Sequence, residues 1–223
     1  METTVFVDAK REQCSVLAKA ERRALNWLVQ RIPSKVGSDH LTLTGFLALF
    51  LAGIFYYCSK SNPLFLHLVN ACLTLNWFGD SLDGTLARYR NKQRPRYGFY
   101  VDHIIDTFGT LFLFSGLALS SYMSQEVAFA LLIAYFMLAI NVYLATYTLG
   151  QFKLSFGKLS PTELRLLLGI GNIALLYHPR IHLLGQSYLL YDIGGLISIG
   201  VMVCVLVAST IRNTKALYEL ERI

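Results

Sequence analysis

Long apolar runs separated by short polar stretches dominate the chain. An α-helix rises about 1.5 Å per residue, so roughly 20 apolar residues cross the hydrocarbon core of a membrane. Six runs approach that length and predict six transmembrane helices. They lie at Leu41–Cys58, Leu64–Gly79, Gly98–Tyr122, Val127–Leu149, Leu164–Tyr177 and Leu189–Ile211. The second run is short, and we expect its helix to continue through Asp80 to Arg88 as a polar end.

The segment before the first run, Lys10–Ile32, mixes charged residues with large apolar ones. Leu17, Ala20, Ala24 and Leu28 recur at three- and four-residue spacing, which places them on one face of a helix. Basic residues occupy much of the remaining surface. The pattern predicts an amphipathic helix on the membrane surface, with a soluble cytoplasmic helix packed on a loop as the alternative.

The composition supports a membrane protein. The chain is 54% hydrophobic and only 15% charged, whereas soluble domains carry about 25% charged residues. The expected organisation is an N-terminal cytoplasmic segment, residues 1–40, followed by one all-α integral membrane domain, residues 41–223. The net charge of +6 is typical of loops that face anionic lipid in so apolar a chain, and we expect no nucleic-acid partner.

The basic residues predict the orientation of the helices. Of the 20 lysines and arginines, 18 lie in the N-terminal segment, the Arg88–Tyr97 loop, the Gly150–Arg165 loop and the C-terminal tail. The connections on the other side hold only Lys60 and Arg180. Because positively charged loops stay in the cytoplasm, both termini of this multi-pass protein are expected there.

Four aspartates stand at regular intervals where the second and third runs meet their connecting loop. Asp80 and Asp83 are three residues apart, and Asp102 and Asp106 are four apart, so each pair shares a helical face. The short loop lets the two helices return antiparallel, and we expect the four carboxylates to converge at the cytoplasmic side. An aspartate within the bilayer costs about 2.5–3.5 kcal/mol, and its neighbours repel it, so the cluster needs a cation. Oxygen ligands favour Mg²⁺ or Mn²⁺, ions that commonly hold substrate phosphates.

Small residues accompany the aspartates. Gly84 lies one turn after Asp80, and Gly98 lies one turn before Asp102. Missing side chains at these positions leave room for a ligand to approach the backbone. Arg88 is placed to pair with a phosphate or with one of the aspartates.

The stretch from Asp80 to Asp106 resembles the signature of the CDP-alcohol phosphotransferase family. That signature reads Asp-x2-Asp-Gly-x2-Ala-Arg, a short gap, and Gly-x3-Asp-x3-Asp. All eight fixed positions are present, as Asp80, Asp83, Gly84, Ala87, Arg88, Gly98, Asp102 and Asp106. The gap of nine residues is slightly longer than is usual in the family, in a loop that should tolerate it. The family's six-helix core with an amino-terminal surface helix matches the pattern above, and the resemblance also implies a homodimer.

The resemblance implies roles for these residues. In the family the four aspartates bind metal that holds the diphosphate of a CDP-alcohol. Gly84, Ala87, Arg88 and Gly98 would then line the nucleotide and diphosphate site. An acceptor hydroxyl attacks the β-phosphorus, CMP leaves, and a phosphodiester forms. The last aspartate, here Asp106, is commonly assigned as the general base.

Two further features are similar to the choline/ethanolamine phosphotransferase branch of the family. His103 directly follows the third aspartate, and FGKLSPTE at Phe156–Glu163 is similar to a segment of that branch. This interpretation makes a CDP-amino alcohol the donor and diacylglycerol the acceptor, with His103 competing with Asp106 as the base. Glu163 agrees with it, because a carboxylate suits a cationic headgroup.

The alternative is a CDP-diacylglycerol-dependent phosphatidyltransferase acting on a polar or phosphorylated alcohol. Lys153, Lys158 and Arg165 would suit an acceptor that brings its own phosphate. These cations are also explained as ordinary basic residues of a cytoplasmic loop.

Two proteins of other classes also use intramembrane carboxylates. An intramembrane prenyltransferase binds diphosphates with aspartate motifs, but usually with two separated motifs on a larger bundle. A divalent-cation transporter needs a continuous polar path, and the third run has no carboxylate after Asp106. Both alternatives are weaker than a CDP-alcohol enzyme.

Overall fold

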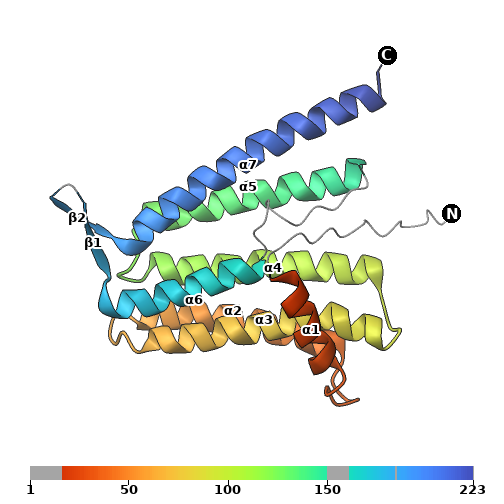
Figure 1. The fold of residues 1–223 in the computed structure, drawn as a ribbon, viewed down its shortest axis with the longest axis horizontal. Helices are drawn as coiled ribbons and strands as arrows, with labels where there is room; N and C mark the ends of the chain where they lie inside the picture. The colour runs from red at the N-terminus through yellow and green to blue at the C-terminus, as the bar shows by residue number, and fades with distance from the viewer. Residues whose placement is uncertain (1–16, 150–160, 184, 223) are drawn as a thin grey trace.

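The computed structural model describes residues 17–149, 161–183 and 185–222. Its described part is helical apart from one β-hairpin (Figure 1). The elements are α1 (Ala18–Val29), α2 (Ser38–Cys58), α3 (Phe65–Tyr89), α4 (Pro95–Ala118), α5 (Gln125–Leu149), α6 (Pro161–Tyr177), β1 (Arg180–Leu183), β2 (Gln186–Leu189) and α7 (Leu190–Leu220). Each of the six apolar runs therefore lies mainly in one helix.

Several of these helices have the dimensions of membrane spans. Within the described residues, α2, α4, α5 and α7 are long and apolar enough to cross a membrane. Helix α6 has only 17 residues, and α3 carries Asp80, Asp83 and Arg88 in its second half. The polar continuation of the second run through Arg88 is confirmed, because α3 ends at Tyr89.

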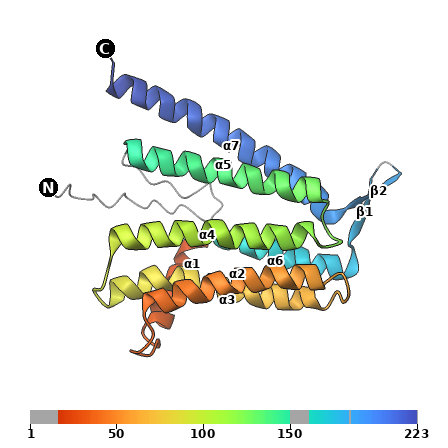
Figure 2. The ribbon, with the colours of Figure 1, turned by 180° about the vertical axis from the view of Figure 1, so that it is seen from behind.

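The long helices run side by side and give the molecule two distinct ends (Figures 1 and 2). Helix α2 packs on α3 and α4, and α6 packs on α3. Helix α5 packs on both α4 and α7. We name the end beside β1 and β2 the hairpin end. The opposite end, where α2, α4 and α6 begin and α3 finishes, is the carboxylate end.

Glycines allow α2 to approach both of its neighbours closely. A Cβ atom on Gly116 of α4 would lie 2.0 Å from the carbonyl oxygen of Gly53. A Cβ atom on Gly79 of α3 would lie 2.5 Å from the carbonyl oxygen of Leu41. Helices in lipid associate through such backbone contacts, since lipid supplies no hydrophobic drive between them.

A sharp turn joins the two helices that carry the aspartates. Asn91 has a φ of 53°, the left-handed conformation that Asn tolerates at a helix C-terminus. The amide of Lys92 then donates to the carbonyl of Ala87 at 2.9 Å. Pro95 occupies the first turn of α4, where a missing N–H group costs nothing. The turn thus returns α4 antiparallel to α3, as expected.

Helix α1 lies across the carboxylate end (Figure 1). It covers the middle of the predicted amphipathic segment, whose residues 10–16 fall outside the described residues. Its packed apolar face consists of the buried Val29 and the half-buried Leu25 and Leu28, which pack with Leu82 and Leu86 of α3. The face differs from the predicted one through Ala20 and Ala24, both of which are exposed. The end of α3 beyond the apolar run supplies the covering leucines.

At the hairpin end a neutral polar network joins four helices. Asn172 of α6 is fully buried, and its Oδ1 accepts hydrogen bonds from Tyr56 of α2 at 2.8 Å and Tyr191 of α7 at 2.7 Å. Its Nδ2 donates to Oδ1 of Asn70 on α3 at 2.7 Å, and Asn70 donates to the carbonyl of Gly169 at 3.1 Å. Such a network fixes the helices relative to one another because its buried polar groups are paired.

Candidate active site

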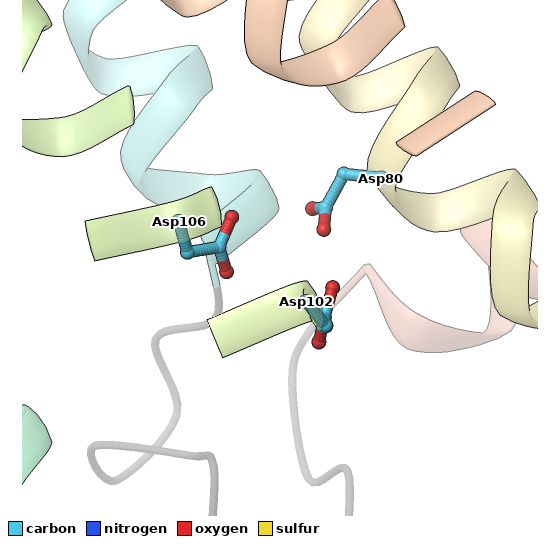
Figure 3. A group of neighbouring side chains, drawn as sticks. All are labelled: Asp80, Asp102 and Asp106. Atoms are coloured by element: carbon cyan, nitrogen blue, oxygen red, sulfur yellow. The ribbon is translucent and has the colours of Figure 1, made fainter. Parts of the chain in front are cut away.

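Three of the four predicted carboxylates come together at the carboxylate end. Asp80 of α3 and Asp102 and Asp106 of α4 each offer an oxygen, and the three oxygens lie within 4.8 Å of one another. Figure 3 shows the carboxylates of Asp80 and Asp106 turned toward each other, with Asp102 beside them. The i, i+4 spacing on α4 and the antiparallel turn produce this arrangement.

Arg165 contacts the cluster from a third helix. Its guanidinium Nη2 lies 2.5 Å from Oδ2 of Asp80, and both side chains are largely buried, with exposures of 16% and 22%. A guanidinium balances part of the negative charge and presents several donors in a fixed plane. Arg165 was expected to contact an acceptor, and its pairing with Asp80 brings the first turn of α6 to the carboxylates.

Asp83, the fourth aspartate, lies outside this group of three. Its carboxylate accepts a hydrogen bond from the Thr42 hydroxyl of α2 at 2.6 Å and is also bonded to the amide of Gly84. The side chain is thereby held between α2 and α3.

A small cavity of about 10 Å³ borders the carboxylates, a volume near the lower limit for a single water molecule. Its lining comprises Thr42, Gly45, Phe46, Leu49, Asn76, Asp80, Asp102, Ile105 and Asp106. Asn76 is 2% exposed and donates from Nδ2 to the carbonyl of Gly45 at 3.0 Å. Its Oδ1 has no hydrogen-bond partner among the described residues. The cavity lining therefore includes the neutral polar side chains of Thr42 and Asn76 beside three carboxylates.

His103 packs against aromatic rings. Its ring stacks on Phe99 at a centroid distance of 4.2 Å and meets Tyr143 of α5 edge-on at 4.9 Å. Its Nδ1 lies 2.7 Å from the Phe99 carbonyl oxygen and 3.7 Å from Oδ2 of Asp102. The ring thus lies next to the cluster, between α4 and α5.

The predicted nucleotide-binding positions extend from the cluster toward the connecting loop. A Cβ atom on Gly84 would meet the Arg88 guanidinium at 3.4 Å, and one on Gly98 would meet nothing within 4 Å. Ala87 borders a second cavity of about 500 Å³. The rest of its lining consists of Ser34, Lys35, Gly37, Ser38, Asp39, His40, Leu86, Arg90, Lys92, Gln93 and Arg94.

The predicted acceptor residues are only partly described. Lys153 and Lys158 lie outside the described residues. Oε1 of Glu163 accepts a hydrogen bond from the backbone amide of Leu17 at 3.3 Å, so this carboxylate contacts the start of α1.

Three residues near the site escaped the sequence analysis. Thr42 and Asn76 are polar residues within apolar runs. Polar residues inside membrane helices often mark functional sites, and this signal could have identified them. Glu21 accepts hydrogen bonds from both α3 and α6. Nothing in the local pattern of α1 distinguishes it from other charged residues of that helix.

Comparison with known proteins agrees with this site. A model of the CDP-alcohol phosphatidyltransferase family matches residues 38–211. The chain belongs to this family. The matched range contains α2–α6, most of α7 and every aspartate of the signature, so the resemblance drawn from the eight motif positions is confirmed.

One curated relative supplies a more detailed comparison. The chain is 34% identical over 125 residues to the CDP-diacylglycerol–serine O-phosphatidyltransferase of Encephalitozoon cuniculi (strain GB-M1). The aligned part covers 54% of this chain and 32% of that protein, so the chain matches about a third of its relative's length. The name of this relative agrees better with the CDP-diacylglycerol alternative than with a CDP-amino alcohol donor.

Proposed function

We propose that this protein is a CDP-diacylglycerol-dependent phosphatidyltransferase of phospholipid biosynthesis. It transfers a phosphatidyl group to the hydroxyl of a small polar alcohol and releases CMP. The convergence of Asp80, Asp102 and Asp106 within 4.8 Å is the observation that carries the chemistry. The named relative supports the choice of donor and makes serine the first acceptor to test.

The carboxylate cluster fits a divalent cation, Mg²⁺ or Mn²⁺. Its ligand atoms are hard oxygens from two helices. Asn76, whose Oδ1 has no hydrogen-bond partner among the described residues, lines the same small cavity. Asp80, Asp102 and Asp106 would hold the ion, with Asp83 as the fourth predicted ligand. A bound ion of this kind supplies positive charge that stabilises the displaced diphosphate oxygen.

The proposed reaction is an in-line substitution at phosphorus. The acceptor hydroxyl oxygen forms a bond to the phosphorus that carries diacylglycerol, and the bond from that phosphorus to the anhydride oxygen breaks. CMP departs with the electron pair. Asp106 accepts the hydroxyl proton as general base, since its carboxylate belongs to the cluster and is turned toward Asp80 (Figure 3).

His103 is the competing base, and its surroundings favour another role. Its ring lies between Phe99 and Tyr143, and its Nδ1 is within hydrogen-bond distance of the Phe99 carbonyl. We assign it to the packing of α4 on α5 beside Asp102.

Basic side chains beside Asp80 and in the cavity next to Ala87 suit anionic substrate groups. Arg165 offers its guanidinium plane to a phosphate or to the carboxylate of serine, groups that arginine binds with paired hydrogen bonds. The cavity beside Ala87, with Arg90, Lys92 and Arg94 in its wall, has the volume of a small-ligand site. We assign it to the nucleotide.

We also propose that six helices, α2–α7, span the membrane, with the site and both termini on the cytoplasmic side. Helices α3 and α6 lie alongside the four long apolar helices (Figures 1 and 2), and the 17 residues of α6 extend about 25 Å. Trp27 of α1 is 56% exposed, with the Arg31 guanidinium 3.7 Å from its ring centroid. Exposed tryptophan and arginine suit a helix at the membrane surface.

The orientation is testable by labelling single cysteines in intact cells. In a variant lacking the native cysteines, a membrane-impermeant maleimide should label Ser61→Cys at the hairpin end and leave Gln93→Cys at the carboxylate end unlabelled. The reverse pattern would contradict the cytoplasmic site. Light scattering in detergent tests the homodimer, which is also part of the proposal.

The donor is tested by measuring CMP release from purified protein with Mg²⁺. CDP-diacylglycerol is offered with serine, inositol, inositol phosphate or glycerol phosphate, and CDP-ethanolamine and CDP-choline are offered with diacylglycerol. We expect acceptor-dependent CMP from CDP-diacylglycerol. CMP from a CDP-amino alcohol alone would overturn the proposed donor in favour of the choline/ethanolamine branch. Pyrophosphate release from a prenyl diphosphate, without CMP from any donor, would contradict the whole assignment.

A further inference from the structure

One side chain of α1 contacts both α3 and α6 beside the candidate site. Oε1 of Glu21 accepts a hydrogen bond from Nε1 of Trp77 at 2.9 Å and from Oγ of Ser81 at 3.3 Å. It accepts a third from Oγ1 of Thr162 at 2.7 Å. A carboxylate that receives several donors forms charge-assisted hydrogen bonds, which are roughly twice as strong as neutral ones.

The three donors lie next to residues of the site. Trp77 and Ser81 flank Asp80 along α3, and Thr162 lies one turn before Arg165 on α6. The backbone amide of Leu17 adds a contact to Glu163 at 3.3 Å. Helix α1 therefore contacts α3 and α6 close to the two residues that form the Asp80–Arg165 ion pair.

These contacts complement the hydrogen bonds at the hairpin end. There, Asn70 of α3 bonds directly to Gly169 and Asn172 of α6. At the carboxylate end, the Asp80–Arg165 pair is accompanied by the bridge through Glu21. A change in the separation of α3 and α6 at this end would move Asp80 relative to Asp102 and Asp106.

We propose that Glu21 is a positioning residue for the carboxylate cluster. By joining Ser81 to Thr162, it sets the separation of α3 and α6 at which Asp80 reaches the carboxylates of α4, and so sets the affinity of the cluster for a divalent cation. The inference rests on the proposed function for the role of the cation, but it concerns binding and is measured without turnover.

The experiment titrates Mn²⁺ into the purified protein in detergent and follows free Mn²⁺ by electron paramagnetic resonance. Glu21→Ala should weaken Mn²⁺ binding about tenfold, the lower end of what loss of an outer-shell partner costs a metal site. Glu21→Gln keeps a carbonyl oxygen that can accept two of these hydrogen bonds, so its affinity should stay within about threefold of the wild type. Arg22→Ala, an exposed neighbour on α1, is the matched control and should bind Mn²⁺ like the wild type.

A purely structural role gives a different result. Glu21→Ala would then lower the melting temperature and leave the Mn²⁺ dissociation constant unchanged, which would overturn the inference. If Glu21→Ala does not fold, the Ser81→Ala/Thr162→Val double variant decides, because it removes two of the donors and keeps the carboxylate. Unchanged Mn²⁺ affinity in that variant overturns the inference, and about tenfold weaker binding supports it.

The measurements distinguish a failure of the proposed function from a failure of the inference about Glu21. Wild-type protein that binds Mn²⁺ but releases no CMP from any donor refutes the proposed reaction, while the titration still decides the role of Glu21. Wild-type protein that binds no Mn²⁺ refutes both.

Discussion

At the hairpin end, Asn172 is fully buried and its amide is bonded to Tyr56, Tyr191 and Asn70. At the carboxylate end, Asp80 and Asp102 keep 22% and 32% side-chain exposure, and Arg165 is the cation paired to Asp80. The network around Asn172 is neutral and its polar groups are hydrogen-bonded to one another. The carboxylate end instead gathers like charges that repel one another.

This contrast indicates a division of labour along the helices. The neutral buried network stabilises the packing of α2 with its neighbours at the hairpin end at low electrostatic cost. Gathered carboxylates oppose that packing unless a cation binds among them. We therefore infer that the hydrogen-bonded packing at the hairpin end stabilises the fold. The gathered carboxylates at the carboxylate end do not stabilise it, and we interpret them as a cation-binding site.

The largest effect should follow from removing one charge at the carboxylate end. Asp102→Asn should lower the Mg²⁺-dependent rate of CMP release at least about 100-fold, since loss of even an outer-shell partner costs a metal site 10–100-fold. Its melting temperature without metal should stay equal or rise, because repulsion with Asp80 and Asp106 falls. Activity within tenfold of the wild type would show that Asp102 is no ligand.

Next in size is the contact between α2 and α4. A methyl group on Gly116 would meet the backbone oxygen of Gly53 at 2.0 Å, so Gly116→Ala should destabilise the protein by about 3 kcal/mol, the upper range for overpacking. Thermal unfolding in detergent measures this loss. Gly200→Ala on α7, where a Cβ meets nothing within 4 Å, is the control and should unfold at or above the wild-type temperature. Equal stability of the two variants would refute the close contact.

A smaller loss should follow from breaking the neutral network. Asn172→Leu leaves the Tyr56 hydroxyl without its acceptor, which should cost about 2 kcal/mol of unfolding free energy. The kcat of the folded fraction should not change, because the network lies away from the carboxylates. A large fall in kcat with normal stability would remove the separation between the two ends.

The smallest effect is expected at His103. Loss of a general base costs 10²–10⁴-fold in rate. Because we assign His103 to packing and not to proton transfer, His103→Gln should reduce kcat less than about tenfold. Initial rates at saturating donor and acceptor measure the change. A reduction of 100-fold or more would instead make His103 the base and assign Asp106 to metal binding alone.

Much of the fold was predictable because apolar runs must form helices in lipid. The expected second run became α3 with its polar end, and the helical spacing of Asp80, Asp102 and Asp106 predicted their approach. The expected convergence of all four aspartates is seen for these three. Asp83 is the exception, because its carboxylate is hydrogen-bonded to the Thr42 hydroxyl and to the amide of Gly84.

Other features depend on contacts between distant segments. Arg165 and Asp80 are 85 positions apart in the sequence, and no local sequence pattern predicts their pairing. The buried face of α1 is set by Leu82 and Leu86, which lie beyond the apolar run of α3. The β-hairpin between α6 and α7 was not predicted, because its two strands are only four residues each.

The most direct test compares wild-type protein with Asp106→Asn. CMP release from CDP-diacylglycerol is measured with Mg²⁺ and the acceptor selected by the donor panel, then repeated with EDTA. The account predicts acceptor-dependent CMP from the wild type, no CMP in EDTA, and at least about 100-fold less in Asp106→Asn, as loss of a general base requires. CMP released equally by both proteins, or unaffected by EDTA, would contradict a metal-dependent transferase site at the carboxylate end.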